Sequence, residues 1–331
     1  MSAHTLPPTA TMPRTRWLGR FLSWEFFLLL ITALVFVINS LASPYFLDPW
    51  NLSDATFNFT EKALVALPLA MLIICREIDL SVASIIALAS VAMGFAANAG
   101  AGPVLLLLVG LLVGAACGFM NGLLVTRFGL SSIVVTIGTM SLFRGVTYIL
   151  LGDEVLKSYP SGFAWFGQGY VWWVFSVEFV VFLLLALVFY VLLHKTRFGR
   201  LTYVIGNNPV GAFYSGVAVD RHRLILFTLV GLVAGLASVM LTSRLGSTRP
   251  TIAQGWELSI ITMVVLGGVN IMGGSGTIPG VFIAVFLMGL VTFGLGLLNV
   301  PGIVMSIVVG AMLIAVIATP ILLNKYLQTR K

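Results

Sequence analysis

Long apolar runs separated by short polar segments dominate this chain. A helix that crosses a bilayer needs about 20 mostly apolar residues. The third and eighth runs are the weakest, because acidic residues or glycine clusters break into them, and either is a candidate for a re-entrant or half-length helix. The pattern predicts an all-α, polytopic membrane protein of about ten helices, over residues 22–42, 56–75, 80–98, 103–126, 131–151, 171–193, 223–243, 255–271, 276–297 and 300–321.

Composition indicates that most of the surface faces lipid. Of 331 residues, 59% are hydrophobic and 9% are charged, whereas soluble domains carry about 25% charged residues. The 34 glycines and 13 prolines suit close helix packing and broken helices in a bilayer. The net charge of +7 does not indicate nucleic-acid binding, because the basic residues lie where membrane topology places them. Cys75 and Cys117 lie in apolar runs and predict neither a disulfide nor a metal site.

The distribution of lysine and arginine predicts the orientation of the helices. These residues gather in segments that share a side with the N-terminus, and basic loops face the cytoplasm. Both tails, a disordered 1–21 and 322–331, and the 195–222 loop are therefore expected in the cytoplasm, around a membrane domain at 22–321. The 152–170 loop is expected outside, where its aromatic residues favour a belt at the membrane interface over a sugar-stacking site.

The 195–222 loop is the most informative segment, because it is basic and contains a predicted short helix. Asn208 is a suitable N-cap, Pro209 fits the first helical position and Gly216 fits the stop. A helix from Pro209 to Ser215 would be about 10 Å long. A capped helix on the basic side offers a contact for a soluble partner. The alternative is an ordinary loop that follows the positive-inside rule.

Two polar interruptions predict breaks in the membrane helices. REIDLS occupies residues 76–81 and GGVNIMGGSG occupies residues 267–276. Breaks at corresponding places in two halves of a chain often mark a transport path, so an internal repeat is also expected. The second break contains Asn270 among glycines that cannot form a stable helix. This composition favours a gate or a second cytoplasmic contact.

Glu77, Asp79 and Ser81 of the first break are candidates for the translocation path. Charges are costly inside a membrane and cheap at its interface. The competing interpretation is a tight cytoplasmic turn, in which Arg76 pairs with an acid and Asp79 or Ser81 caps the next helix. That interpretation is favoured for Asp79. Because a cap needs only one acid, Glu77 is the stronger functional candidate.

Arg144 and Glu257 are further candidates for the path or its gate. Arg144 lies inside the fifth run, where an arginine is functional by default. Alternatively, it lies one or two turns from the cytoplasmic end and snorkels to the interface. Glu257 lies beside Trp256 near the outer end of the eighth run. It could meet substrate hydroxyls, dock a soluble partner, or be an ordinary interfacial acid.

No enzyme site is predicted, and no cofactor or metal is expected. The P-loop pattern GxxxxGK[ST] is absent, so the energy for a pump would come from a partner or from an ion gradient. His4, His194 and His222 have no nucleophile or metal-ligand spacing nearby. A membrane-embedded enzyme is therefore a weaker interpretation than an ATP-driven permease or an ion-coupled secondary sugar transporter.

Four motifs occur in a fixed order along the chain. They are EIDLSVASI at 77–85, NGLLVTRFGLSSIVVTIGTMSLFRG at 121–145, TRFGRLTYVIGNNPVGAFYSGV at 196–217 and VVLGGVNIMGGSGTIPGVFIA at 264–284. Together they resemble the permease family of bacterial monosaccharide ABC importers, which carry ribose, xylose, arabinose, galactose, rhamnose or autoinducer-2. The resemblance runs from about residue 45 to residue 318. It implies an inner-membrane subunit without an ATPase site, working by alternating access.

The resemblance also implies a set of partners and a contact loop. The partners are a second permease subunit, identical or paralogous, a cytoplasmic ABC ATPase pair, a periplasmic sugar-binding protein and membrane lipid, with no nucleic acid. By motif match, the loop that contacts the ATPase includes Arg197, Gly199, Arg200, Gly206, Asn208, Ala212, Ser215 and Gly216.

One departure from the family pattern affects the first break. The family usually has two glycines before IDLSVGS, where this chain has Arg76 and Glu77, and Ala83 replaces the usual later glycine. The turn is therefore expected to be stiffer or to pair differently. The pattern is nearer to the rhamnose and autoinducer-2 branches than to ribose permeases. The expected substrate is rhamnose, a related pentose or deoxyhexose, or autoinducer-2.

Overall fold

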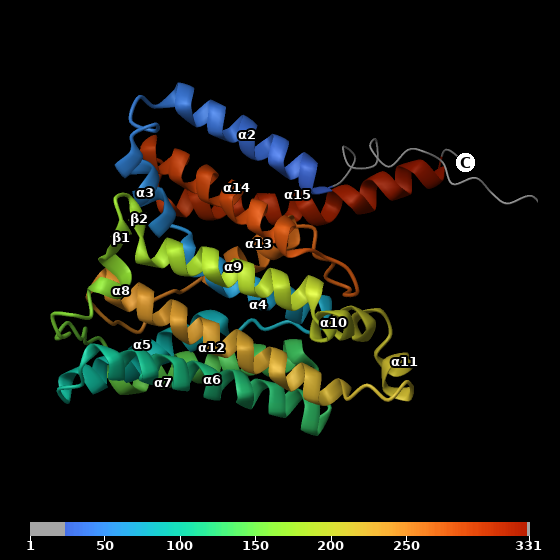
Figure 1. Ribbon diagram of the computed structural model, residues 1–331, viewed down its shortest axis with the longest axis horizontal. Coiled ribbons are helices and arrows are strands. Elements are labelled where there is room, and N and C mark those ends of the chain that lie inside the picture. Colours follow the sequence, from blue (N-terminus) through green and yellow to red (C-terminus); the bar gives the residue numbers. More distant parts are fainter. Residues whose placement is uncertain (1–23, 330–331) are drawn as a thin grey trace, which may run out of the picture.

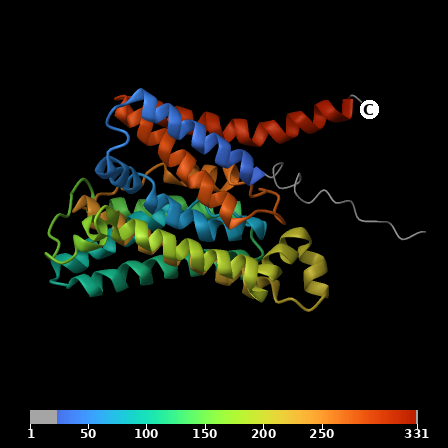
Figure 2. The same ribbon diagram turned by 45° about the horizontal axis from the view of Figure 1, so that its top comes forward.

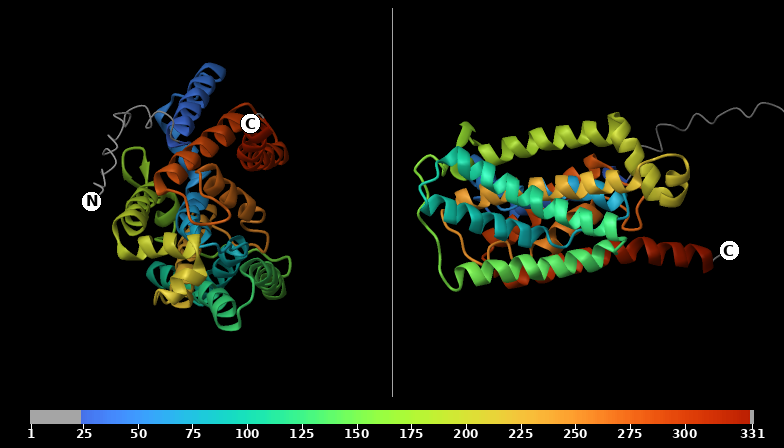
Figure 3. Two further views of the ribbon diagram at one scale, coloured as in Figure 1. Left: turned by 90° about the vertical axis from the view of Figure 1, so that its right-hand side faces the viewer. Right: turned by 90° about the horizontal axis from the view of Figure 1, so that it is seen from below.

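The long elements of the protein are helices that lie side by side along one direction (Figure 1). The computed structural model describes residues 24–329. We call the end with α8 and the β1–β2 hairpin the hairpin end, and the opposite end the α11 end (Figures 1 and 3). The elements are α2 (Trp24–Ala42), α3 (Pro49–Phe57), α4 (Thr60–Ile74), α5 (Val82–Asn98), α6 (Pro103–Phe128), α7 (Ser132–Leu151), α8 (Trp165–Gln168), β1 (Tyr170–Trp172), β2 (Phe175–Ser176), α9 (Val177–Lys195), α10 (Arg197–Asn207), α11 (Pro209–Tyr214), α12 (Val219–Leu245), α13 (Trp256–Leu266), α14 (Ile278–Leu297) and α15 (Gly302–Thr329).

Six of the described helices, α2, α6, α7, α9, α12 and α14, are long and apolar enough to cross a membrane. α3 and α4 pass the same test together, with a bend of 51° between them. α5, α13 and the Gly302–Ala315 part of α15 are shorter apolar helices. The prediction of an all-α, polytopic membrane protein is confirmed, whereas length and composition do not confirm about ten spans. The two weakest runs of the sequence correspond to the short helices α5 and α13.

α4 occupies the centre of the bundle. All its residues except Lys62 are buried, and it contacts α3, α9, α10, α12, α13 and α14. A helix that is apolar on all sides packs inside other helices. α2, α14 and α15 lie on one side of α4, and α5, α6 and α7 lie on the other (Figures 1 and 2).

α6 and α12 make the most extensive helix contact. Gly114 and Gly118 of α6 face Gly231 and Gly235 of α12, and a Cβ atom on any of these four would overlap the backbone of the other helix. Small residues allow membrane helices to approach this closely. The contact fixes α12, whose first turn follows α11 in the chain.

The predicted terminal segments are only partly covered by the structure. The 1–21 tail lies outside the described residues. α15 continues through most of the predicted 322–331 tail, to Thr329, and extends past the bundle at the α11 end (Figures 1 and 2).

Candidate coupling site

α11 is a short capped helix, as the sequence predicts. The side-chain oxygen of Asn208 accepts a hydrogen bond from the Gly211 N–H, at 2.9 Å. Ser215 follows the helix, and its hydroxyl donates to the Gly211 carbonyl, at 2.8 Å. Gly216 has a φ of +81°, which glycine adopts at little cost. The prediction is confirmed, with the last helical residue at Tyr214 rather than Ser215.

α11 presents an apolar face to its surroundings. Val210, Phe213 and Tyr214 are 64%, 65% and 83% exposed, and their spacing of i, i+3 and i+4 places them on one side of the helix. Ala212, which the resemblance assigns to the loop that contacts the ATPase, is only 2% exposed and packs into the protein. The sequence pattern does not indicate these three exposed residues, because six residues are too few for a helical pattern. Their presence within a basic loop was the available signal.

Exposed cations flank this apolar face in the chain. Lys195, Arg197 and Arg200 precede it and Arg221 follows it, with Asp220 as the one exposed acid of the segment. Exposed apolar residues within a basic segment suit a partner that offers a hydrophobic groove and acidic residues.

α10 attaches α11 to the membrane helices. The Thr202 hydroxyl and Nε2 of His222 are hydrogen-bonded at 2.8 Å, and the Phe198 ring stacks on the same imidazole at 4.1 Å. The Tyr203 hydroxyl donates to the Gly276 carbonyl, at 2.7 Å. Burial raises the pKa of Tyr203, which keeps this phenol a donor. At the start of α10, Gly199 is buried against the backbone of Leu193.

The end of α4, just before the first predicted break, meets the second break and the end of α10 at one point, formed by Ile74, Gly206 and Gly274, which we call the glycine junction. The Gly274 N–H donates to the Ile74 carbonyl, at 2.8 Å. Gly206 lies so close to the same carbonyl that a Cβ atom would overlap it. Asn207 donates from Nδ2 to the Gly274 carbonyl, at 3.2 Å. A displacement of α10 therefore acts directly on the end of α4 and on the α13–α14 loop.

The first break is held by an ion pair that differs from the predicted one. Nε of Arg223 lies 2.9 Å from Oε1 of Glu77, so the acid pairs with α12 and not with Arg76. Arg76 instead donates from Nη2 to the Asn207 carbonyl, at 3.1 Å. Its φ is +67°, a value that glycine adopts more easily. The expected pairing of Arg76 with an acid is therefore wrong.

Asp79 and Ser81 are buried inside the bundle rather than at its surface. Oδ1 of Asp79 accepts hydrogen bonds from the Ser81 N–H, at 2.8 Å, and from the Ser81 hydroxyl, at 2.6 Å. Asn121 of α6 donates to the Ser81 hydroxyl, at 2.8 Å. Ser81 precedes α5 but forms no side-chain cap. Asp79 thus stabilises the turn before α5. The side chains of the break form a cluster of hydrogen-bonded polar groups within an apolar core.

Asn270 and Glu257 lie apart from this cluster. The side chain of Asn270 accepts from the Met272 N–H, at 3.0 Å, and its N–H donates to the Ser275 carbonyl, at 3.0 Å. Asn270 therefore shapes the exposed turn between α13 and α14. Glu257 is half-buried in the first turn of α13 and forms no ion pair within residues 24–329.

Arg144 lies in the second half of α7, away from the predicted cytoplasmic end. From Nη1 it donates to the carbonyls of Pro250 and Ile252, at 2.6 and 2.8 Å, and from Nη2 to that of Ala83, at 3.3 Å. The interpretation of a residue snorkelling near the cytoplasmic end is therefore wrong. The guanidinium ties α7 and α5 to the loop between α12 and α13.

A buried ion pair at the hairpin end was not predicted. Nε of Arg244 lies 2.7 Å from Oε1 of Glu61. Glu178 is also fully buried, and its carboxylate has no hydrogen-bond partner among the described residues. These residues come from three helices far apart in the sequence, so no spacing motif could reveal the cluster.

Comparison with known proteins distinguishes between the competing interpretations. Residues 51–317 match a family model described as the permease component of the branched-chain amino acid transport system. The ribose import permease protein RbsC of Bacillus subtilis is 37% identical over 284 residues, which cover 85% of this chain and 88% of that protein. The chain belongs to this permease family. The autoinducer 2 import system permease protein LsrD of Escherichia coli K12 is also 37% identical to the permease, over 300 residues that cover 89% and 91% of the two chains. No solved structure matches.

These relatives identify the permease as a membrane subunit of the monosaccharide ABC importer type. The matched region contains α10, α11 and the glycine junction, together with both breaks. The relatives are transport subunits, so they do not support the interpretation of a membrane-embedded enzyme.

Proposed function

We propose that the permease is the membrane-spanning subunit of an ATP-driven importer that moves a monosaccharide or autoinducer-2 into the cytoplasm. The observation that carries the proposal is the route from the exposed face of α11, through α10, to the glycine junction. The names of the relatives favour ribose or autoinducer-2 as the substrate. They give no support to rhamnose.

The proposed topology has ten membrane segments: α2, the bent α3–α4 pair, α5, α6, α7, α9, α12, α13, α14 and α15. An even number places both termini on one side. That side is the cytoplasm in this proposal, because the exposed cations around α11 lie at the same end as the C-terminal part of α15. A soluble sugar-binding protein would then meet the hairpin end, and a second permease subunit would complete the membrane unit.

The mechanism follows from the contacts of α10. Movement of a bound ATPase displaces α11, and α10 transmits the displacement through its hydrogen bonds to the α13–α14 loop and its backbone contact with α4. Because α4 is buried among six other helices, a shift at its end moves the packing on both sides of the bundle. The substrate path then opens alternately to the outside and to the cytoplasm.

A docking experiment tests the role of α11. Phe213→Asp should abolish co-purification of the ATPase with the permease, because it places a charge in the apolar face. Val171→Asp is the matched control, since Val171 is an exposed apolar residue of β1 at the opposite, hairpin end. Co-purification of both variants at the wild-type level would exclude α11 as the ATPase contact.

An ion-coupled transporter is the second candidate function. The fully buried carboxylate of Glu178, which has no hydrogen-bond partner within residues 24–329, favours it, because buried acids carry protons or ions in many secondary transporters. Such a transporter would import its sugar without ATP and would be insensitive to Phe213→Asp.

A further inference from the structure

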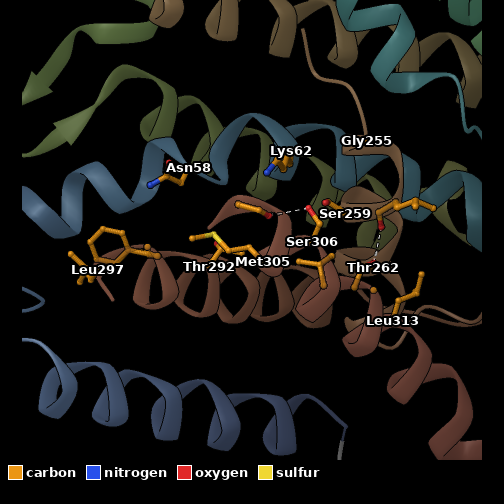
Figure 4. Close-up of a pocket in the computed structure, with 16 residues that line it drawn as sticks. Asn58, Lys62, Gly255, Ser259, Thr262, Thr292, Leu297, Met305, Ser306 and Leu313 are labelled. Carbon is orange, nitrogen blue, oxygen red and sulfur yellow. Dashed lines mark hydrogen bonds between the residues drawn. The ribbon is translucent and has the colours of Figure 1, made fainter. Parts of the chain in front are cut away.

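A cavity of about 520 Å³ lies between α4, α13, α14 and α15 (Figure 4). Its lining residues come from the parts of these helices nearest the hairpin end. Lys62 and Ser259 belong to the first turns of α4 and α13, Thr292 to the last turns of α14, and Ser306 to the second turn of α15. Cavities of this size hold small molecules in many proteins. In the proposed topology this one lies in the outer half of the membrane.

The cavity offers hydrogen-bond acceptors on two of its walls, α14 and α15. The hydroxyls of Thr292 and Ser306 each donate to a main-chain carbonyl of their own helix, at 2.9 and 3.2 Å. A hydroxyl oxygen that donates its proton in this way keeps lone pairs for a second partner. Neither residue is buried, so these oxygens are available to the O–H groups of a ligand.

The cavity also offers donors that the protein does not use. Nζ of Lys62 lies 4.9 Å from the centre of the Trp256 ring and has no hydrogen-bond acceptor among residues 24–329. The Ser259 hydroxyl likewise has no hydrogen-bond partner in the described part of the chain. An ammonium group carries three donors and a serine hydroxyl carries one. The ring contact holds the ammonium group beside the cavity without consuming these donors.

An apolar cavity that offers both free donors and free acceptors matches one class of ligand. Every hydroxyl of a polyol both donates and accepts, and its C–H faces pack against apolar walls such as Phe293 and Met305. No acidic residue lines the cavity, so nothing there neutralises a cationic ligand. We propose that the cavity is a binding station for the transported monosaccharide, an uncharged polyol, on its way in from the hairpin end. This inference rests on the proposed function.

Filling the cavity tests the inference in the assembled importer, reconstituted with its ATPase and binding protein. The probe is the sugar that the wild-type complex takes up best from a panel of ribose, xylose, arabinose, galactose, rhamnose and autoinducer-2. Ser306→Trp should reduce uptake about tenfold or more, because the indole excludes the ligand. ATP hydrolysis stimulated by the loaded binding protein should stay within about twofold of wild type, because the glycine junction is intact. Ile307→Trp is the matched control: the adjacent residue is exposed and does not line the cavity, so uptake should be unchanged.

Removing the donor of Lys62 gives a second, milder test. Lys62→Met should reduce uptake about fivefold, whereas Lys62→Gln should retain most of it because the amide still donates. Equal uptake by the two variants would show that the ammonium donor does not contact the sugar.

Cysteine labelling decides the case if the tryptophan variant fails to assemble. Cys75 and Cys117 are buried, so Ser259→Cys provides the accessible thiol. A membrane-impermeant thiol reagent added outside should label it, and the sugar-loaded binding protein should slow labelling about threefold or more. Wild-type uptake by Ser306→Trp, or labelling that the sugar does not slow, would overturn the inference. Failure of the wild-type complex to take up any sugar with ATP would instead overturn the proposed function.

Discussion

Replacing Gly206 by alanine should separate ATP hydrolysis from transport. The added methyl group would overlap the Ile74 carbonyl and would lie 2.7 Å from the Gly274 nitrogen. Both atoms belong to the 2.8 Å hydrogen bond that joins the end of α4 to the second break. Backbone atoms cannot rotate out of the way as a side chain can, so either α10 moves away from α4 or the hydrogen bond opens.

The size of the effect follows from the atoms involved. Overpacking of this kind costs about 1–3 kcal/mol, and loss of the hydrogen bond costs about 1 kcal/mol. Alanine returns up to about 1 kcal/mol through its higher helix propensity. The net destabilisation of the junction is roughly 1–3 kcal/mol. A loss of this size in the coupling between ATP hydrolysis and transport corresponds to a factor of about 5 to 150.

Two measurements on the reconstituted importer check this prediction. The number of sugar molecules transported per ATP hydrolysed should fall severalfold, and the thermal midpoint of the permease should decrease. Gly102→Ala is the control, because Gly102 has nothing within 4 Å of an added Cβ and a φ of −75°. If Gly206→Ala retains both the wild-type ratio and the wild-type midpoint, the glycine junction does not transmit the movement of α11.

Three further predictions concern Arg76, Glu77 and Arg144. The free energy of unfolding should be at least about 2 kcal/mol higher for Arg76→Gly than for Arg76→Val, since valine resists the left-handed backbone. Denaturant titrations of both variants measure the difference. Glu77→Gln should cost about 1–3 kcal/mol by leaving Arg223 without its partner, and adding Arg223→Met should recover part of the loss in a double-mutant cycle. Arg144→Met should lower the free energy of unfolding by about 2–4 kcal/mol because buried carbonyls lose their donor, and Arg144→Lys should be intermediate. Equal thermal midpoints for the lysine and methionine variants would contradict the contact of Arg144 with two carbonyls.

The features that the sequence predicts well are local ones. The first apolar run at 22–42 corresponds to the helix Trp24–Ala42, and the cap residues around α11 place that helix within one residue. Both rest on neighbours in the chain, either the length of an apolar run or a side chain that caps the next turn. The two interrupted runs are also found, because acids and glycine clusters oppose helix formation wherever they occur.

Contacts between distant segments could not be predicted in the same way. Glu61 and Arg244 are 183 positions apart, and Glu77 pairs with Arg223 although Arg76 is its neighbour. The direction that each side chain faces depends on which helices pack together, and apolar runs of similar length do not specify their neighbours. For the same reason Ala212 was expected on the surface of α11, whereas the structure places it inside.

The energy source of transport tests the central claim most directly. Permease, ATPase and binding protein are reconstituted in proteoliposomes. Uptake of the sugar panel is measured with ATP on the side of the liposome membrane that carries the ATPase. The same uptake is then measured with a proton or sodium gradient and no ATP. The account predicts uptake that requires ATP and is lost in Phe213→Asp. Uptake driven by an ion gradient without ATP, at the same rate in wild type and Phe213→Asp, would contradict it.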